Sequence, residues 1–412
     1  MDDRARLAGS SRKHPTGQPA CHRLVYVVTA SATAQGFLRG QLGYMRSCGF
    51  EVTLVASPDP TLDAIRLSEG VEVRGVPMSR SISLTQDLRS LLQLIRLFRE
   101  LRPDIVNVGT PKAGLLAGLA AAFCRVPYRI YTLHGLRLEG ATGARRRLLA
   151  ATEWISCRSA HAVHCVSRSL RNRVLSMRLA TPSKAIVLGN GSCNGVDTAW
   201  FRPAQEPIAT ARQRRSLGIH RDARVIGYVG RITRDKGIRE LVEAYVTVRG
   251  QRPDLHLLLV GQPDDTDPLD DDVRSALSRI GDVTITGWVA NPAPYYHCMN
   301  VFVLPTYREG LPQTALEAAA SAVPVVTTDA TGARDAVIHG VTGLVVRRGD
   351  AGSLATALAR LLDDPELACR LGSKGRAWVS RAFVQERVWM SLAELYRYHA
   401  AKREACKVLD FP

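Results

Sequence analysis

The segment Glu309-Gly-Leu-Pro-Gln-Thr-Ala-Leu-Glu317 carries two carboxylates eight residues apart. The apolar run 301–305 before it has the pattern of a short strand, and the alanine-rich run 316–322 after it has the pattern of a helix. Glu309 is therefore expected just past the carboxyl end of a strand, where open α/β sheets bind ligands. A helix amino end attracts phosphate through its free N–H groups, and carboxylates beside it accept hydrogen bonds from hydroxyl groups. Together these features predict a nucleotide sugar as the ligand.

The bulk composition is that of a two-domain globular protein. At 412 residues the chain is too long for one ordinary hydrophobic core, and 46% of it is hydrophobic. Its nine cysteines form no CxxC pair and no cluster with zinc spacing, which favours a reducing compartment. Residues 1–22 are polar and lack the apolar core of a signal peptide, so we interpret them as a disordered tail. The apolar run 113–124 is shorter than a membrane-spanning helix and predicts a buried helix.

Strand and helix patterns alternate along both halves of the chain. In the first half, strands are predicted at 24–28, 51–55, 71–76, 105–108, 128–133 and 162–166, and helices at 37–48, 88–101, 113–124 and 145–158. In the second half, strands are predicted at 225–229, 255–260, 283–287, 301–304, 324–327 and 342–346, and helices begin near 238 and 316. This α/β alternation predicts two doubly wound parallel sheets facing a cleft. The turn-rich segment 190–197 marks the boundary, which gives a first domain of residues 23–195 and a second of residues 196–386.

Two glycine-containing loops are candidates for binding phosphate. Gly230-Arg-Ile-Thr-Arg-Asp-Lys-Gly237 follows a strand and opens a helix, and its Arg231 and Lys236 suit a diphosphate. It lacks the spacing of a dinucleotide fingerprint or a P-loop, and basic residues beside a turn are also common on a solvated surface. The loop 31–36 follows the first strand, and its Gly36 would let the backbone approach a phosphate. A helix start that needs a small residue explains Gly36 equally well.

Two further features have both a functional and a structural interpretation. His134 follows the strand 128–133 and precedes a glycine, which places it at the cleft, although a lone histidine is more often structural. The segment 264–272 holds six aspartates and is similar to an Asp-x-Asp metal site. It also leads into a helix, and acidic residues there stabilise the helix start. We prefer the second interpretation of this segment and expect no metal ion.

The excess positive charge lies almost entirely in the first half of the chain. Residues 1–200 contain 27 Lys and Arg against 13 Asp and Glu, whereas residues 201–412 contain 28 against 25. Such a bias predicts an anionic partner. Only 6% of the residues are aromatic and no nucleic-acid-binding motif is present, so we expect no nucleic acid but an anionic membrane surface. The residues 145–147 and the amphipathic run 88–101 would contact it, and a solvated helix face is the alternative explanation.

Several motifs in order resemble the retaining GT-B glycosyltransferases of family 4, over about residues 23–400. The signature of this family is the pair Glu309-x7-Glu317 within Tyr307-Arg-Glu-Gly-Leu-Pro312 and the helix after it. Matching motifs elsewhere are Thr132-Leu-His134-Gly135, Asn194-Gly-Val-Asp197, Val229-Gly-Arg231 with Lys236-Gly237, Pro324-Val-Val-Thr327 and Gly340-Val-Thr-Gly343. With Thr110-Pro-Lys112, the first half looks most like the bacterial branch that makes capsule, exopolysaccharide and lipid-linked oligosaccharide.

The resemblance implies the site residues and their roles. Implied for catalysis are His134, Arg231, Lys236 and Glu309. Implied for donor binding are Gly36, Gly230, Arg231, Lys236, Glu309, Gly310, Leu311, Pro312 and Glu317. The two basic residues would neutralise the donor diphosphate, and His134 would contact the donor sugar near its reacting carbon. Glu309 would orient sugar hydroxyls with help from the N–H groups of Gly310 and Leu311, and Glu317 would hold the ribose.

The resemblance also implies the outline of the fold and of the reaction. The helix 387–402, whose apolar stripe contains Trp389, Leu392, Leu395 and Tyr396, would cross back onto the first domain. Family members need no metal or other cofactor and keep the anomeric configuration, by front-face attack or through a short-lived ion pair. This chain departs from the family at Gly36, where many relatives have two glycines. It also has the segment 330–335, ending in Asp335, in place of Gly-Gly-x-x-Glu.

These observations predict a cytoplasmic enzyme, peripheral on the inner face of the cell membrane. It would transfer a hexose or N-acetylhexosamine from a nucleotide diphosphate sugar, which we expect to be UDP-linked, to a lipid-linked or glycan acceptor. A nucleotide-sugar epimerase of the same fold and a non-catalytic nucleotide-sugar-binding protein are the alternatives. A dinucleotide-dependent oxidoreductase is disfavoured, because neither Gly36 nor Gly230 begins a Gly-x-Gly-x-x-Gly motif.

Overall fold

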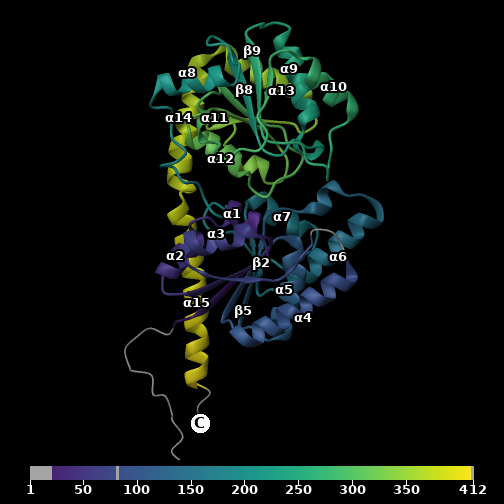
Figure 1. Cartoon of the computed structure of the whole chain (residues 1–412), viewed down its shortest axis with the longest axis vertical. Coiled ribbons are helices and arrows are strands. Elements are labelled where there is room, and N and C mark those ends of the chain that lie inside the picture. The colour runs from purple at the N-terminus through teal and green to yellow at the C-terminus, as the bar shows by residue number, and fades with distance from the viewer. Residues whose placement is uncertain (1–20, 80–82, 410–412) are drawn as a thin grey trace, which may run out of the picture.

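The computed structural model describes residues 21–79 and 83–409, with side chains up to residue 402. Most of the predicted disordered tail, residues 1–22, therefore lies outside the described residues. Figure 1 shows two lobes, one above the other, each built on a sheet flanked by helices. The first sheet has seven parallel strands in the order β3-β2-β1-β4-β5-β6-β7, and the second has six in the order β10-β9-β8-β11-β12-β13. The predicted α/β fold with two doubly wound sheets is confirmed.

The first lobe contains most of the chain up to residue 195. Its elements are β1 (Arg23–Ala30), α1 (Ser31–Phe37), α2 (Gln41–Ser47), β2 (Glu51–Ser57), α3 (Pro60–Glu69), β3 (Glu72–Gly75), α4 (Leu84–Leu101), β4 (Ile105–Gly109), α5 (Pro111–Phe123), β5 (Tyr128–Leu133), η1 (Arg137–Gly140), α6 (Gly143–Ser159), β6 (Ala162–Cys165), α7 (Arg168–Ser176) and β7 (Ala185–Ile186). One face of the sheet packs against α1, α2, α3 and the last helix of the chain, and the other packs against α4 to α7.

The second lobe repeats the same architecture. Its elements are α8 (Pro207–Ser216), β8 (Arg224–Val229), η2 (Arg234–Lys236), α9 (Ile238–Arg249), β9 (Leu255–Val260), α10 (Asp271–Arg279), β10 (Val283–Ile285), α11 (Ala293–Tyr296), β11 (Val301–Leu304), α12 (Gln313–Ala320), β12 (Val325–Thr328), η3 (Ala333–Ala336), β13 (Gly343–Val346), α13 (Ala351–Asp363) and α14 (Pro365–Ala382). Its central strands are buried along their length, as parallel strands covered on both faces must be.

The last helix, α15 (Gln385–Leu409), returns to the first lobe as predicted and is longer than the predicted 387–402. Figure 1 shows it running along one side of the first lobe, below α14. Trp389, Leu392 and Tyr396 of its apolar stripe are buried against the first sheet. The Tyr396 hydroxyl lies 3.0 Å from that of Tyr26 and accepts a 2.7 Å hydrogen bond from Asn107. These buried polar contacts fix the helix in register on the sheet.

The chain crosses between the lobes at two places that touch each other. Val196, on the first crossing, forms a bridge with Val384, on the second, and its N–H donates to Phe383. Gly195 has φ +69°, and a Cβ there would lie 2.7 Å from the carbonyl oxygen of Phe383. Glycine is therefore required where the two crossings meet.

The start of the first lobe differs from the prediction. Helix α1 begins at Ser31 directly after β1, so the predicted loop 31–36 is wrong and Gly36 lies inside a helix. Helix α3 was not predicted at all, although Asp59 and Pro60 carry a helix-start signal. The Asp59 carboxylate accepts hydrogen bonds from the N–H groups of Thr61 and Leu62, at 2.8 and 3.2 Å. The start of α3 is therefore better predicted by its capping residue than by the spacing of its apolar residues.

The apolar run 113–124 forms the buried helix that was predicted. It corresponds to α5, in which Ala113, Ala117 and Ala120 are fully buried between the sheet and its neighbouring helices. Among the described residues, no helix combines the length and the apolar character that crossing a bilayer requires.

Candidate active site

A cavity of about 190 Å³ lies between the two lobes, at the carboxyl ends of both sets of strands. The first lobe contributes Phe37, His134, Val166 and Cys193 to its lining. The second lobe contributes Tyr228, Val229, Gly230, Lys236, Leu304, Glu309, Gly310, Leu311, Pro312, Gln313 and Thr314. The cavity thus brings together seven of the predicted site residues: His134, Gly230, Lys236, Glu309, Gly310, Leu311 and Pro312. It is not lined by Gly36, Arg231 or Glu317.

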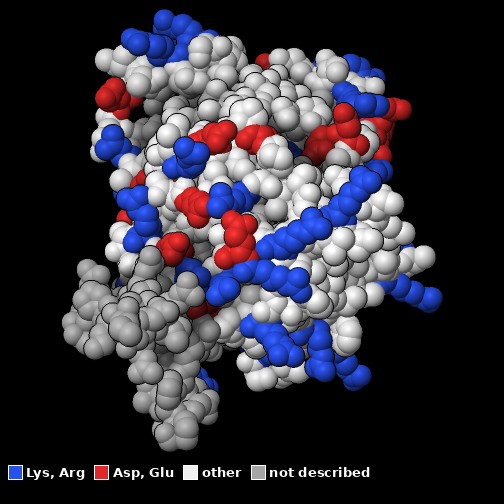
Figure 2. Space-filling view, turned by 60° about the horizontal axis from the view of Figure 1, so that its bottom comes forward, with Lys and Arg blue, Asp and Glu red and all other residues white. Residues whose placement is uncertain are grey.

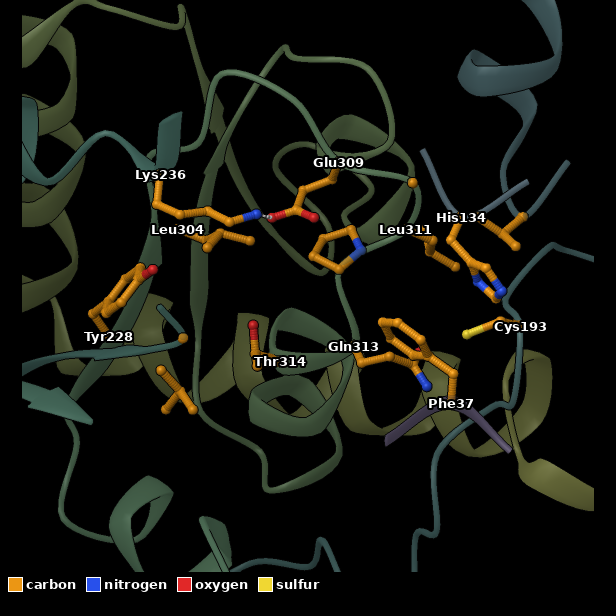
Figure 3. Close-up of a pocket in the computed structure, with 15 residues that line it drawn as sticks. Phe37, His134, Cys193, Tyr228, Lys236, Leu304, Glu309, Leu311, Gln313 and Thr314 are labelled. Atoms are coloured by element: carbon orange, nitrogen blue, oxygen red, sulfur yellow. Dashed lines mark hydrogen bonds and ion pairs between the residues drawn. The ribbon is translucent and has the colours of Figure 1, made fainter. Parts of the chain in front are cut away.

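The centre of the site is an ion pair between Lys236 and Glu309. The Lys236 ammonium donates to the Glu309 carboxylate at 2.5 Å, and the two side chains are 15% and 18% exposed. Figure 3 shows them pointing toward each other, with His134, Phe37 and Cys193 on the other side of the cavity. Lys236 follows β8 and Glu309 follows β11, the two strands between which the strand order of this sheet reverses. That switch point is where α/β sheets place their ligands.

Close backbone packing fixes the loop that carries Glu309. The Glu309 N–H donates to the carbonyl of Thr331 at 2.8 Å. A Cβ on Gly310 would lie 2.1 Å from the carbonyl oxygen of His134, so the loop touches the first lobe backbone to backbone. Gly332 has φ +76°, and a Cβ there would lie 2.3 Å from the carbonyl oxygen of Gly310. Both positions exclude any side chain, which explains the glycine at each of them.

His134 faces this loop from the first lobe. Its ring stacks on Phe37, with the centroids 5.0 Å apart and the planes 13° from parallel. Burial lowers the pKa of His134 to about 4, so the imidazole is neutral near pH 7. Its Nδ1 is buried and has no hydrogen-bond partner among the described residues. The ring is thus held by packing on one face of the cavity, as a neutral polar group.

Glu317 lies just outside the cavity, on α12, one helical turn beyond the lining residues Gln313 and Thr314. Its carboxylate accepts a 2.7 Å hydrogen bond from the buried hydroxyl of Tyr296. Burial raises the pKa of Glu317 to about 7, and the Tyr296 hydrogen bond partly opposes this rise. Tyr296 was not singled out from the sequence, because its contact with α12 depends on how α11 packs.

Arg231 points away from the cavity and toward the acidic segment 264–272. Its guanidinium donates to Asp264 at 2.8 Å, and its side chain is 52% exposed. This hydrogen bond, with others from Thr266, holds the pKa of Asp264 well below its usual range. The expected pair of basic residues is therefore divided, because Lys236 contacts Glu309 while Arg231 contacts Asp264.

Other aspartates of the acidic segment also contact arginines. Asp267 contacts Arg234, and Asp270 and Asp272 contact Arg239. Asp271 and Asp272 occupy the first turn of α10, where negative charge favours a helix. Across the part of the chain that the structure describes, no group of three or more His, Cys, Asp or Glu side chains is arranged to hold a metal ion. The contacts favour the structural interpretation of this segment.

Polar contacts that the sequence did not predict join the two lobes beside the cavity. Asp335 accepts hydrogen bonds from the hydroxyl of Ser169 and from its N–H at 3.2 Å. Ser169 lies in the first turn of α7, so a carboxylate from the second lobe caps a helix of the first. Thr331 donates to Glu139 at 2.9 Å across the same boundary. Asp335 stands at the position where the segment 330–335 departs from the family pattern.

The sequence matches two glycosyltransferase families, one in each half. Residues 35–191 match the family described as glycosyl transferase 4-like domain, and residues 223–364 match glycosyl transferases group 1. The capsular polysaccharide biosynthesis glycosyltransferase CapM of Staphylococcus aureus is 35% identical over 374 residues, which cover 91% of this chain and 96% of that protein. The chain belongs to the family 4 GT-B glycosyltransferases. It lies in the branch that includes capsular polysaccharide enzymes.

Two further matches share less of their sequence with this glycosyltransferase. The Escherichia coli UDP-Gal:alpha-D-GlcNAc-diphosphoundecaprenol alpha-1,3-galactosyltransferase is 26% identical over 324 residues, covering 77% of this chain and 81% of that protein. Among solved structures, Anabaena Alr3699/HepE in complex with UDP and glucose superposes with a TM-score of 0.77 at 18% identity. That alignment covers 92% of this chain and 100% of the Anabaena chain, and it supports the same two-lobed fold.

Replacing Glu317 by Gln tests the electrostatic consequence of its burial. The folded-state pKa of about 7 lies above the ordinary 4.5, so the folded protein keeps a proton that the unfolded chain releases. This proton's contribution to the stability of the fold is fully present below the unfolded-state pKa of 4.5. It is lost as the pH rises through the folded-state pKa of about 7. Glu317→Gln should therefore raise the melting temperature relative to wild type at about pH 8. After allowance for partial solvent access, we expect about 1–2 kcal/mol, or a few degrees.

Differential scanning fluorimetry at about pH 5 and pH 8 measures this effect. The gain should be much smaller at the lower pH, where Glu317 is protonated in the folded state. Glu394→Gln, which removes an exposed carboxylate on α15, is the matched control and should change neither value. An equal shift at both pH values would contradict a raised pKa for Glu317.

Proposed function

We propose that this glycosyltransferase transfers a hexose or N-acetylhexosamine from a UDP-sugar, with retention of configuration, to a lipid-linked or glycan acceptor in cell-surface polysaccharide synthesis. The observation that carries the proposal is the partly buried Lys236–Glu309 pair, which faces His134 across a cavity shared by the two lobes. A cation for phosphate and a carboxylate for hydroxyls are the two groups that a nucleotide sugar needs. The UDP-linked donor and lipid diphosphate acceptor named for the Escherichia coli relative, and the UDP and glucose in the Anabaena structure, support this choice.

In the proposed complex, donor binding exchanges the partners of both cations. The diphosphate takes the place of Glu309 beside Lys236, and the released carboxylate accepts hydrogen bonds from the sugar. Arg231 leaves Asp264 and turns toward the same diphosphate, so that two fixed charges stabilise the departing nucleotide without a metal ion or other cofactor. The N–H groups of Gly310 and Leu311 bind the sugar and phosphate, and Glu317 binds the ribose. Neutral His134 contacts the sugar near the reacting carbon.

The central experiment replaces Lys236 and Glu309 separately by Ala. A thermal-shift screen of UDP-, GDP-, ADP- and dTDP-sugars first selects the donor, and turnover is then followed with and without sugar-linked lipid diphosphate acceptors. Each substitution should reduce transfer by about 100-fold or more, the usual effect of losing one preorganised charged contact. Arg234→Ala is the matched control, because Arg234 lies on the same turn but contacts Asp267 outside the cavity. Transfer near the wild-type rate in either variant would refute these roles, and donor conversion without acceptor would indicate an epimerase.

Asp264→Asn should have the opposite effect on donor affinity. It removes the carboxylate that holds Arg231, so the guanidinium becomes available to the diphosphate. Because exposed ion pairs contribute up to about 1 kcal/mol, we expect UDP to bind about two- to fivefold more tightly in titration calorimetry at low salt. Asp265→Asn makes the same charge change at an exposed neighbour and is the control. Equal gains in both variants would indicate a general charge effect and not release of Arg231.

The membrane surface belongs to the same proposal. Helices α4, α5 and α6 pack side by side on the first lobe and expose apolar side chains that include Leu88, Leu92, Phe123, Leu148 and Trp154. The exposed arginines of these helices include Arg89, Arg96, Arg99, Arg145, Arg146, Arg147 and Arg158. Figure 2 shows basic side chains gathered in the lower right of this view, on the side where Figure 1 has α4 and α6, with acidic side chains mainly above them. Exposed apolar groups among arginines suit the interface of an anionic bilayer.

Arg145, Arg146 and Arg147 replaced together by Ala should weaken binding to vesicles of phosphatidylglycerol and phosphatidylcholine. Each basic residue near an anionic surface contributes about 1 kcal/mol, so we expect a loss of at least about tenfold in co-sedimentation at low salt. The same change at Arg212, Arg215 and Arg221, which are exposed on the second lobe, should have little effect. Binding that is absent in the wild type, or insensitive to salt, would refute a peripheral membrane location.

A further inference from the structure

The face of the first sheet beneath α1, α2 and α15 becomes polar near the carboxyl ends of its strands. Tyr26 and Asn107 are paired across β1 and β4, and Thr132 and His164 across β5 and β6. Thr132 donates to Asn107 at 2.8 Å, and Asn107 donates to Tyr396 of α15 at 2.7 Å. His164, which is opposite Thr132, takes no part in this chain of hydrogen bonds.

A second, small cavity lies beside these residues. Its volume is about 10 Å³, and its polar lining consists of Tyr26, Gln41, Asn107, Thr132, His134 and His164. His134 and Cys193 line both this cavity and the larger one between the lobes. The small cavity is therefore directly behind the histidine of the proposed donor site, and we call it the rear cavity. A space of this size with several polar groups around it accommodates about one water molecule.

Both histidines of the rear cavity have unused ring nitrogens. His164 is fully buried, and neither of its nitrogens has a hydrogen-bond partner among the described residues. The buried Nδ1 of His134 likewise has none among them. Because His164 is opposite Thr132 in the sheet, and His134 comes two residues after Thr132, the two rings are on the same face. Adjacent strands are about 4.8 Å apart, so the rings are near enough to share one bridging molecule.

Packing and stability do not explain a histidine at position 164. An unpaired buried polar group costs about 1–3 kcal/mol, and an aliphatic side chain in the same space would avoid that loss. Burial, together with the nearby His134, lowers the pKa of His164 to about 3, and burial lowers that of His134 to about 4. Each ring is therefore neutral near pH 7, with one N–H donor and one acceptor nitrogen. In a neutral imidazole, the partner of one nitrogen decides the role of the other.

We propose that His164 is a positioning residue, which holds an ordered water in the rear cavity and through it fixes the tautomer of His134. The water donates to the unpaired Nδ1 of His134, so the proton is on Nε2, the nitrogen that lies beside Gly109. His164 and Thr132 supply the other partners of the water. This inference rests on the proposed role of His134, and it adds a residue from a neighbouring strand that contacts no substrate itself.

The test compares His164→Leu with the wild type in the absence of any substrate. Protein labelled with 15N-histidine reports the tautomer of each of the ten histidines through long-range 1H–15N correlations, and a His134→Gln variant assigns the signals of His134. The wild type should show the Nε2–H tautomer at His134. His164→Leu should show a mixture of tautomers, a higher melting temperature, and transfer that is about tenfold slower, while the affinity for UDP stays unchanged.

Two further variants separate positioning from packing. His164→Gln retains a donor and an acceptor and should restore the single tautomer of His134. Val163→Ala is the control, because Val163 is buried on the opposite face of the same strand and should lower the melting temperature without changing the tautomer. An unchanged tautomer in His164→Leu would overturn the proposal, and so would a mixed tautomer in the wild type. If UDP fails to bind the wild type, the proposed function fails, whereas the tautomer of His134 remains measurable.

Discussion

The backbone of Gly310 lies against the backbone carbonyl of His134, and the two halves of the active site depend on this contact. The two residues come from different lobes, and a Cβ on Gly310 would lie 2.1 Å from that carbonyl oxygen. With no side chain between them, the loop that carries Glu309 is brought next to the neutral imidazole of the first lobe. A larger residue at 310 would separate the lobes and open the cavity on this side. Polar contacts such as Asp335 with Ser169 then hold the lobes together around the same point.

Charge in the free site is balanced by internal partners. Lys236 neutralises Glu309 inside the cavity, where an unpaired charge would be strongly destabilising, and Arg231 neutralises Asp264 at its edge. In the proposed function, a nucleotide diphosphate would enter by replacing these carboxylates with phosphate and not by filling an exposed basic pocket. In that exchange each cation stays paired, whereas Glu309 and Asp264 lose their cation partners to the diphosphate. Under this proposal the gain of phosphate contacts is offset by the loss of two ion pairs, and the sugar and ribose contacts would decide which donor is retained.

The sequence predicted the strands and the position of the main carboxylate, because both follow from local patterns. Apolar runs of four to six residues marked the central strands, and Glu309 had to come just after one of them. The ion-pair partner of Arg231 could not be predicted in the same way, because it does not depend on the neighbouring sequence. Its side chain could contact a phosphate or Asp264, and nothing within its own loop decides between them. Gly36 was assigned to a loop because a glycine near a strand end resembles one, whereas the helix forms from Ser31 onward. Asp335 and Ser169 are far apart in the sequence, and their contact follows from the arrangement of the lobes.

The role proposed for His164 could not be predicted from the sequence, because it follows from the absence of a hydrogen-bond partner among the described residues. In the sequence it is one polar residue in an otherwise apolar strand, and such a residue is usually satisfied by a neighbour. Here its neighbour Thr132 already donates to Asn107, and Asn107 donates to Tyr396 of the returning helix. The hydrogen bonds that anchor α15 thus use the groups that would otherwise pair with His164. In the proposed arrangement, the water of the rear cavity would connect His164 to Thr132 and so to the network that anchors α15.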